Sequence, residues 1–180
     1  MIDQVLTATL GAPPRLGGVR VLAIDGPSGS GKSTLARAVV ERHPGCALIS
    51  TDDFATWDDP VSWWSRLENG VLAPLRTGHP GTYQRMEWPG GVPRLGEWVT
   101  VEVPDILVIE GVSAGRRAVH HRLSCLVWVD FTSAPARLDR AAARDGERSR
   151  PHLRRWQQFE AGWFAVDDPA ARAGLKFHSG

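Results

Sequence analysis

Four short apolar runs recur along the chain, at residues 21–24, 47–49, 106–109 and 126–129. Continuous runs of this length are typical of strands that are buried on both faces of a parallel sheet. Residues 33–42 follow the first run without glycine or proline and predict a helix that leads to the second run. A strand, a helix and a strand with short links form a βαβ unit. The pattern therefore predicts an α/β fold in three layers, with a mainly parallel sheet and helices on both faces.

Weaker patterns predict the elements around this sheet. Residues 1–10 predict a short amphipathic helix whose aliphatic side chains share one side: Ile2, Val5, Leu6 and Leu10. Asp58-Asp59-Pro60 predicts the start of another helix, and Asn69-Gly70 predicts its end. Residues 71–103 are rich in glycine and proline, and their last valines alternate with polar residues. We expect an irregular or antiparallel excursion there, outside the core layers.

Two further helices are predicted near the end of the chain. Ser133 can cap a helix that has Pro135 in its first turn and runs to Arg144. A last helix begins near Pro151, with Ser149 as its cap. Its large apolar residues fall mostly on one face and predict packing against the core: Leu153, Trp156, Phe159, Trp163 and Phe164.

A glycine-rich loop separates the first apolar run from the first predicted helix. Gly26, Gly31, Lys32 and Ser33 match the pattern G-x-x-x-x-G-K-[ST]. Glycines let backbone N–H groups turn towards phosphates, and the following helix presents the positive end of its dipole to the anion. The sequence therefore predicts an ATP or GTP site, which the loop would hold through Gly26, Ser28, Gly29, Ser30, Gly31, Lys32, Ser33 and Thr34.

Two side chains of this loop have specific roles in the predicted site. Lys32 is expected to reach the β- and γ-phosphates, and the Ser33 hydroxyl is expected to ligate Mg²⁺. The chain has two lysines, and the other is Lys176. Because no lysine lies nearby in the sequence, we expect that none can replace Lys32.

Acidic residues end three of the apolar runs. Asp25 directly precedes the loop, Asp52 and Asp53 follow the second run, and Glu110 closes the third. Parallel strands end at one edge of a sheet, so these acids should lie beside the phosphate loop. A kinase needs a Mg²⁺ shell and often a carboxylate that accepts the acceptor's proton. Glu110 fits a metal ligand, and Asp52 fits the base and a further metal ligand. The alternative is that these acids only cap neighbouring helices, which we favour for Asp25 and Asp53.

Basic residues recur at helical spacing further along. Arg137, Arg140 and Arg144 would share one helix face, and Arg148 and Arg150 follow in a polar segment. Such a cluster could cover the triphosphate and neutralise charge on the transferred group. The alternative is an ordinary solvated basic face.

Composition narrows the class of protein. A length of 180 residues suits one domain with a single core, and a net charge of +1 gives no indication of a nucleic-acid surface. No stretch approaches the roughly 20 apolar residues of a spanning helix, and residues 1–10 lack a basic leader segment. Cys46 and Cys125 have no C-x-x-C partner, which favours buried thiols in a reducing compartment. We expect a cytoplasmic protein that binds neither nucleic acid nor membrane, and we leave homo-oligomer formation open.

Four segments together resemble the uridine kinase family of P-loop kinases. They are residues 26–34, 49–54, 109–112 and 137–145, and their order and rough spacing agree over about residues 19–165. The resemblance implies that Asp52 is the catalytic aspartate, which accepts the proton of a ribose 5′-hydroxyl. It implies that Ser33 and Glu110 ligate Mg²⁺ and that Arg140 and Arg144 are lid arginines.

The resemblance also implies positions on the acceptor side. Asp58 would lie near the ribose, and Tyr83 would lie next to the nucleobase. Asp53 and Arg85 are further candidates for contacts with the substrate. Several tryptophans crowd this region of the sequence: Trp63, Trp64, Trp88 and Trp98.

We therefore predict one P-loop kinase domain over residues 1–180, with an acceptor-side insert at about 57–103 and an arginine-rich lid at about 137–150. Its predicted reaction transfers the γ-phosphate of ATP, with Mg²⁺, to a hydroxyl of a uridine- or cytidine-like nucleoside or a similar small molecule. One alternative is a nucleoside monophosphate kinase, in which arginines of the insert bind the anionic acceptor: Arg66, Arg76, Arg85 and Arg94. Another is a non-catalytic ATP-binding regulatory module, although the N-K-x-D motif of switch GTPases is absent from the sequence.

Overall fold

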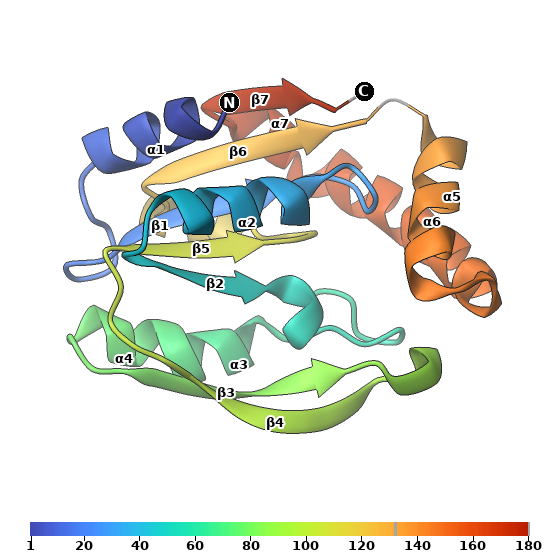
Figure 1. The fold of residues 1–180 in the computed structure, drawn as a ribbon, viewed down its shortest axis with the longest axis horizontal. Coiled ribbons are helices and arrows are strands. Elements are labelled where there is room, and N and C mark those ends of the chain that lie inside the picture. The colour runs from blue at the N-terminus through green and yellow to red at the C-terminus, as the bar shows by residue number, and fades with distance from the viewer. Residues whose placement is uncertain (132, 180) are drawn as a thin grey trace.

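The computed structural model describes residues 1–131 and 133–179. Within these residues, five strands form a parallel sheet in the order β2-β5-β1-β6-β7 (Figure 1). Strand β1 (Arg20–Asp25) is central and lies between β5 (Ile106–Glu110) and β6 (Cys125–Asp130). The edge strands are β2 (Cys46–Ser50) and β7 (Leu175–His178). The predicted parallel sheet is confirmed, whereas β7 was not predicted because its four residues are only partly apolar.

The register of the strands brings three chain segments to one edge. Ile24 of β1 is level with Glu110 of β5, and Glu110 is level with Ser50 of β2. Because the strands are parallel, the segments that follow them start at the same edge of the sheet. The glycine-rich loop after β1 and the 3₁₀ turn Thr51–Asp53 after β2 therefore lie beside the end of β5.

Helices cover both faces of the sheet, as predicted. Leu22 and Ile24 of β1 pack in one cluster with α1 (Ile2–Gly11) and α2 (Lys32–Arg42). Val21 and Ala23 point to the other face, because successive side chains of a strand alternate. In α1 the buried residues are Val5, Leu6 and Thr9, whereas Leu10, which was predicted on the same side as Val5 and Leu6, is exposed. The Thr9 hydroxyl donates to the Val5 carbonyl at 2.8 Å.

The helix of the insert begins later and ends later than predicted. It runs from α3 (Trp64–Leu67) through a π-helical turn (Glu68–Leu72) to α4 (Ala73–Arg76). Asp59 forms a turn instead of a helix start, because its carboxylate accepts the N–H of Ser62 at 2.8 Å. Gly70 does not end the helix but lets it approach β3, since a Cβ there would lie 2.5 Å from the Thr82 carbonyl oxygen.

The rest of the insert is an antiparallel hairpin of β3 (Gly81–Glu87) and β4 (Arg94–Val101), joined through a 3₁₀ turn at Pro89–Gly91. This confirms the antiparallel alternative. The expectation that the insert stays outside the core was wrong. Tyr83 and Val101 of the hairpin pack in one cluster with Val21 and Ala23 of β1, together with Leu67, Val71, Leu72 and Leu75 of the insert helix.

Helices α5 (Ala134–Asp145) and α6 (Arg150–Asp167) stand side by side beyond the carboxyl edge of the sheet (Figure 1). The Ser133 hydroxyl caps α5, as predicted, by accepting the N–H of Ala136 at 3.2 Å. In the predicted apolar stripe of α6, Leu153 is buried and the four aromatic residues are half-buried. The other buried residue of this helix is Glu160. Short helices at Glu147–Ser149, Pro169–Arg172 (α7) and Arg117–Arg122 complete the described chain. Across those residues every helix is too short or too polar to cross a membrane.

Two helical glycines test the packing of the insert. A Cβ at Gly70 would press on the Thr82 carbonyl, whereas a Cβ at Gly162 of α6 would meet nothing within 4 Å. We expect Gly70→Ala to lower the free energy of unfolding by about 1–3 kcal/mol through overpacking. Gly162→Ala should raise it by about 0.5–1 kcal/mol, because alanine is the better helix former. Equilibrium chemical denaturation measures both, and a stabilised Gly70→Ala protein would contradict this packing.

Candidate active site

The glycine-rich loop turns sharply between β1 and α2. Gly26, Gly29 and Gly31 have φ angles of 146°, 79° and 96°, which residues with a side chain rarely adopt. Gly31 directly precedes α2, so the N-terminus of this helix opens onto the loop. The backbone therefore has the form that an anion cradle requires.

Glu110 connects two strands and a helix at this edge. Its buried carboxylate lies 3.2 Å from the Ser33 hydroxyl of α2 through each oxygen, and the Ser50 hydroxyl of β2 donates to it at 2.9 Å. Lys32 is also buried, and its ammonium donates to the Pro27 carbonyl of the loop at 2.9 Å. The structure thus brings together Lys32, Ser33 and Glu110.

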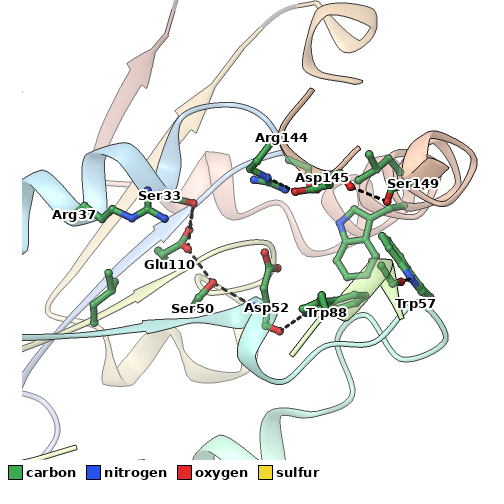
Figure 2. Close-up of a pocket in the computed structure, with 15 residues that line it drawn as sticks. Ser33, Arg37, Ser50, Asp52, Trp57, Trp88, Glu110, Arg144, Asp145 and Ser149 are labelled. Atoms are coloured by element: carbon green, nitrogen blue, oxygen red, sulfur yellow. Dashed lines mark hydrogen bonds and ion pairs between the residues drawn. The ribbon is translucent and has the colours of Figure 1, made fainter. Parts of the chain in front are cut away.

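Asp52 lies in the turn after β2, where its backbone N–H donates to the Ser50 hydroxyl at 3.3 Å. Figure 2 shows its side chain pointing into a cavity, on the side where Arg144 and Asp145 lie. Although the carboxylate is open to the cavity, desolvation by the surrounding protein and the nearby Glu110 charge raise the pKa of Asp52. Lys32 and Arg144 act in the opposite direction. A carboxylate with a raised pKa is the better proton acceptor.

The cavity has a volume of about 560 Å³ and extends from the phosphate loop to a group of tryptophans. Ser33, Arg37 and Glu110 lie towards one end, Trp57 and Trp88 lie towards the other, and Asp52 lies between them (Figure 2). An adjoining hollow is lined by Lys32 and by the loop, and it shares Asp52 and Glu110 with the cavity. The loop, both carboxylates and the tryptophans therefore border one connected space.

The arginines of α5 and of the start of α6 take different positions. Arg144 lines the cavity and pairs with Asp145 through two contacts of 2.6 and 2.7 Å. Arg140 borders the loop hollow, and its guanidinium lies 4.3 Å from the centre of the Phe131 ring. Arg150 instead forms ion pairs of 2.7 Å with Glu147 and Asp139, which are exposed.

Four residues were predicted to contact the acceptor substrate, and none of them is among the residues that line the cavity: Asp53, Asp58, Tyr83 and Arg85. The Tyr83 hydroxyl donates to the Asp53 carboxylate at 2.6 Å, and the Tyr83 ring stacks on Phe54 in the core, 4.8 Å between centres. Asp58 is exposed on the loop before α3. Arg85 pairs with glutamates of its own hairpin, the nearer at 2.7 Å. These positions fit a structural role for Asp53, Tyr83 and Arg85. The Asp58 side chain has no hydrogen bond or ion pair with the other residues that the structure describes.

The Asp25 carboxylate binds backbone N–H groups and is not part of the cavity lining. It is fully buried and accepts the N–H groups of Gly26, Ser113 and Gly115 at 2.7, 3.1 and 2.8 Å. Burial raises the pKa of Asp25 to about 6, against these hydrogen bonds and Lys32, which lower it. These contacts give Asp25 a structural role, but they hold the loops after β1 and β5 and do not cap a helix as the alternative supposed.

Glu160 of α6 is a residue that sequence reasoning missed. It is 2% exposed, and its carboxylate accepts the Ser28 N–H of the phosphate loop at 3.1 Å as well as the Ser28 hydroxyl. Burial raises the pKa of Glu160, and Lys32 opposes this most strongly. A glutamate in a polar helix gives no local signal of such a role, although its place on the half-buried face of α6 is a weak one.

The oxygen ligands present suit magnesium. Within residues 1–131 and 133–179, no group of three or more His, Cys, Asp or Glu side chains is arranged to hold a metal ion. In kinase sites, however, Mg²⁺ takes one or two protein oxygens and completes its shell with phosphates and water. Ser33 and Glu110, with Asp52 on the same space, supply such oxygens.

Together, the strand–loop–helix unit and the parallel sheet define a P-loop nucleotide-binding fold of the kinase type. Residues 21–86 match a family model described as an AAA domain. No curated protein sequence matches significantly.

Comparison with solved structures identifies the fold more specifically. The chain is similar to a structure described as a possible uridine kinase from Bacillus stearothermophilus, with 20% identity, a TM-score of 0.68, and coverage of 98% of this chain and 96% of that chain. It is also similar to D-glycerate 3-kinase from Cryptococcus neoformans, with 16% identity, a TM-score of 0.61, and coverage of 89% and 87%. At these identities the likeness concerns the fold, and it confirms the predicted P-loop kinase fold.

Replacement of Glu160 tests its contact with the loop. Glu160→Ala removes the acceptor of the partly buried Ser28 N–H and hydroxyl, so we expect it to lower the free energy of unfolding by about 1–3 kcal/mol. Gln158→Ala, which removes an exposed side chain of the same helix, should change it by at most about 0.5 kcal/mol. Urea denaturation compares the two, and equal stability would show that Glu160 does not hold the loop.

Proposed function

We propose that this protein is an ATP-dependent kinase that transfers the γ-phosphate to a hydroxyl of an uncharged, nucleoside-like small molecule. The observation that carries the proposal is that Asp52 borders the same space as Lys32 and Glu110. In-line transfer needs a phosphate cradle, a metal ligand and a proton acceptor around one point. The kinase-type fold supports the same conclusion.

Different residues have different roles in the proposed reaction. The loop N–H groups and Lys32 hold the β- and γ-phosphates, for which the Lys32 ammonium leaves the Pro27 carbonyl. Ser33 and Glu110 would hold Mg²⁺, to which Asp52 would offer a further oxygen, and the ion would supply positive charge against the phosphates. Arg140 and Arg144 stabilise charge on the transferred group.

Asp52 is the proposed base. Its carboxylate accepts the proton of the acceptor hydroxyl as that oxygen forms a bond to the γ-phosphorus. The bond from the γ-phosphorus to the bridging oxygen breaks, and ADP leaves. The raised pKa of Asp52 supports this role, because a more basic carboxylate accepts the proton more readily.

The arginines of the insert support an uncharged acceptor over a nucleoside monophosphate. Arg66 donates to the backbone carbonyls of Phe54 and Gln84 at 3.2 and 2.7 Å. Arg76, Arg85 and Arg94 form ion pairs with glutamates of the insert. Among the described residues that line the cavity, none is an arginine of the insert. A phosphate on the acceptor would therefore find no cation of the insert on this side.

Asp52→Asn tests the proposed base. The amide cannot accept the proton, so we expect kcat with nucleosides to fall by about 10²–10⁴-fold while the Kd for ATP changes by less than about threefold. Isothermal titration gives the affinity, and a coupled assay of ADP release gives the rate. Asp3→Asn, which removes an exposed carboxylate from α1, is the matched control and should behave as the wild type.

Lys32→Ala completes the set, since it should weaken ATP binding itself. Near-normal turnover by Asp52→Asn would remove Asp52 from the mechanism. Normal ATP binding by Lys32→Ala would show that the loop assignment is wrong. ATP binding by the wild type without transfer to any nucleoside or monophosphate would favour the regulatory alternative.

A further inference from the structure

Three tryptophans from distant parts of the chain form one side of the cavity. Trp57 comes from the loop after β2, Trp88 from the turn between β3 and β4, and Trp156 from α6. The ring centre of Trp57 lies 4.9 Å from that of Trp88 and 5.9 Å from that of Trp156, with both partners nearly perpendicular to it. His152 stacks on Trp57 at 5.0 Å. We call Trp57, Trp88 and Trp156 the aromatic wall.

The polar atoms of two wall residues already have partners. The Trp57 indole N–H donates to the Gly91 carbonyl at 2.8 Å, and the Trp88 indole N–H donates to the Asp52 carbonyl at 3.3 Å. These hydrogen bonds fix the indoles and leave ring carbon as the surface that they offer to the cavity. The second bond also ties Trp88 to the residue whose carboxylate is the proposed base (Figure 2).

Apart from Asp52, the charged residues around the cavity are either paired with each other or lie towards the phosphate end. The charged residues in its described lining are Arg37, Asp52, Glu110, Arg144 and Asp145. Arg144 and Asp145 neutralise each other through their two-point ion pair. Arg37 and Glu110 lie with Ser33 at the phosphate end, and Asp52 lies between the two ends (Figure 2). A ligand group at the wall therefore meets apolar rings and no unpaired cation.

We propose that the aromatic wall binds a flat, uncharged ring of the acceptor, of nucleobase type, and thereby positions the acceptor hydroxyl at Asp52. The inference rests on the proposed function and names the part of the acceptor that the protein recognises. Indole rings bind the faces of planar heteroaromatic rings, and this stacking tolerates different bases. Tyr83, in contrast, has its hydroxyl bonded to Asp53 and its ring stacked in the core. Ring recognition thus falls to Trp57, Trp88 and Trp156.

Equilibrium binding tests the wall without turnover. In the presence of a non-hydrolysable ATP analogue, uridine, cytidine, adenosine and ribose are titrated into the protein, and binding is measured by calorimetry. We expect at least one nucleoside to bind at least about tenfold more tightly than ribose, which carries the hydroxyl but no ring. Trp88→Leu and Trp57→Leu should each raise the Kd of that nucleoside about tenfold and leave the Kd of the ATP analogue unchanged.

Two further variants separate stacking from folding. Trp88→Phe keeps an aromatic ring and should restore most of the nucleoside affinity that Trp88→Leu loses. Trp98→Leu removes a tryptophan that is 70% exposed on β4 and should bind as the wild type. Thermal unfolding of each variant shows whether it is folded. If Trp88→Leu is not folded, the nucleoside affinity of Trp88→Phe decides whether the wall binds the ring.

The outcomes distinguish this inference from the proposed function. Nucleoside binding that depends on the wall, without phosphate transfer, would keep the ring site and remove the kinase. Transfer to ribose as efficient as transfer to nucleosides would keep the kinase and overturn the ring site. Failure of all three nucleosides to bind, or binding that Trp57→Leu and Trp88→Leu leave intact, would also overturn it.

Discussion

The carboxylate of Glu110 is the group on which the arrangement of the site depends. A buried carboxylate is costly unless it is hydrogen-bonded, and here the hydroxyls of Ser33 and Ser50 supply the bonds. Those hydroxyls come from α2 and β2, which meet Glu110 only in the observed register of β1, β5 and β2. The hydrophobic core sets that register. The burial of the apolar strands therefore determines the geometry of the site.

The two carboxylates at this edge have different surroundings, and the difference suits different tasks. Glu110 is buried and bonded to hydroxyls, which suits a fixed ligand for a metal. Asp52 follows a single 3₁₀ turn and points into open space, which suits a group that must meet a substrate. Its neighbours Glu110 and Lys32 act on its pKa in opposite directions. Desolvation, which raises the pKa of Asp52 most, and the proximity of a second carboxylate thus both favour the proton-accepting role that we propose for Asp52.

Local patterns were sufficient to predict the sheet and the loop, because continuous apolar runs and the G-x-x-x-x-G-K-S spacing report their own structure. They failed where distant segments decide. Gly70 resembles a helix end, but its role follows from the approach of Thr82, twelve residues later. Glu160 resembles a solvated glutamate until α6 is placed against Ser28. The loops that carry Trp57 and Trp88 have no periodicity, so only the structure shows that the two rings meet.

The contacts of Trp57 also connect the insert with the arginine-bearing helices. Trp57 packs against the small core of α5 and α6, which consists of Leu138, Ala141, Ala142 and Leu153. Arg140 and Arg144 are on the same α5 helix as three of these residues. A ligand that contacts Trp57 therefore contacts the support of both arginines, and it can favour one position of α5 only through such differential contacts. In the proposed reaction, acceptor recognition and the placement of positive charge over the phosphates thus depend on one shared packing contact.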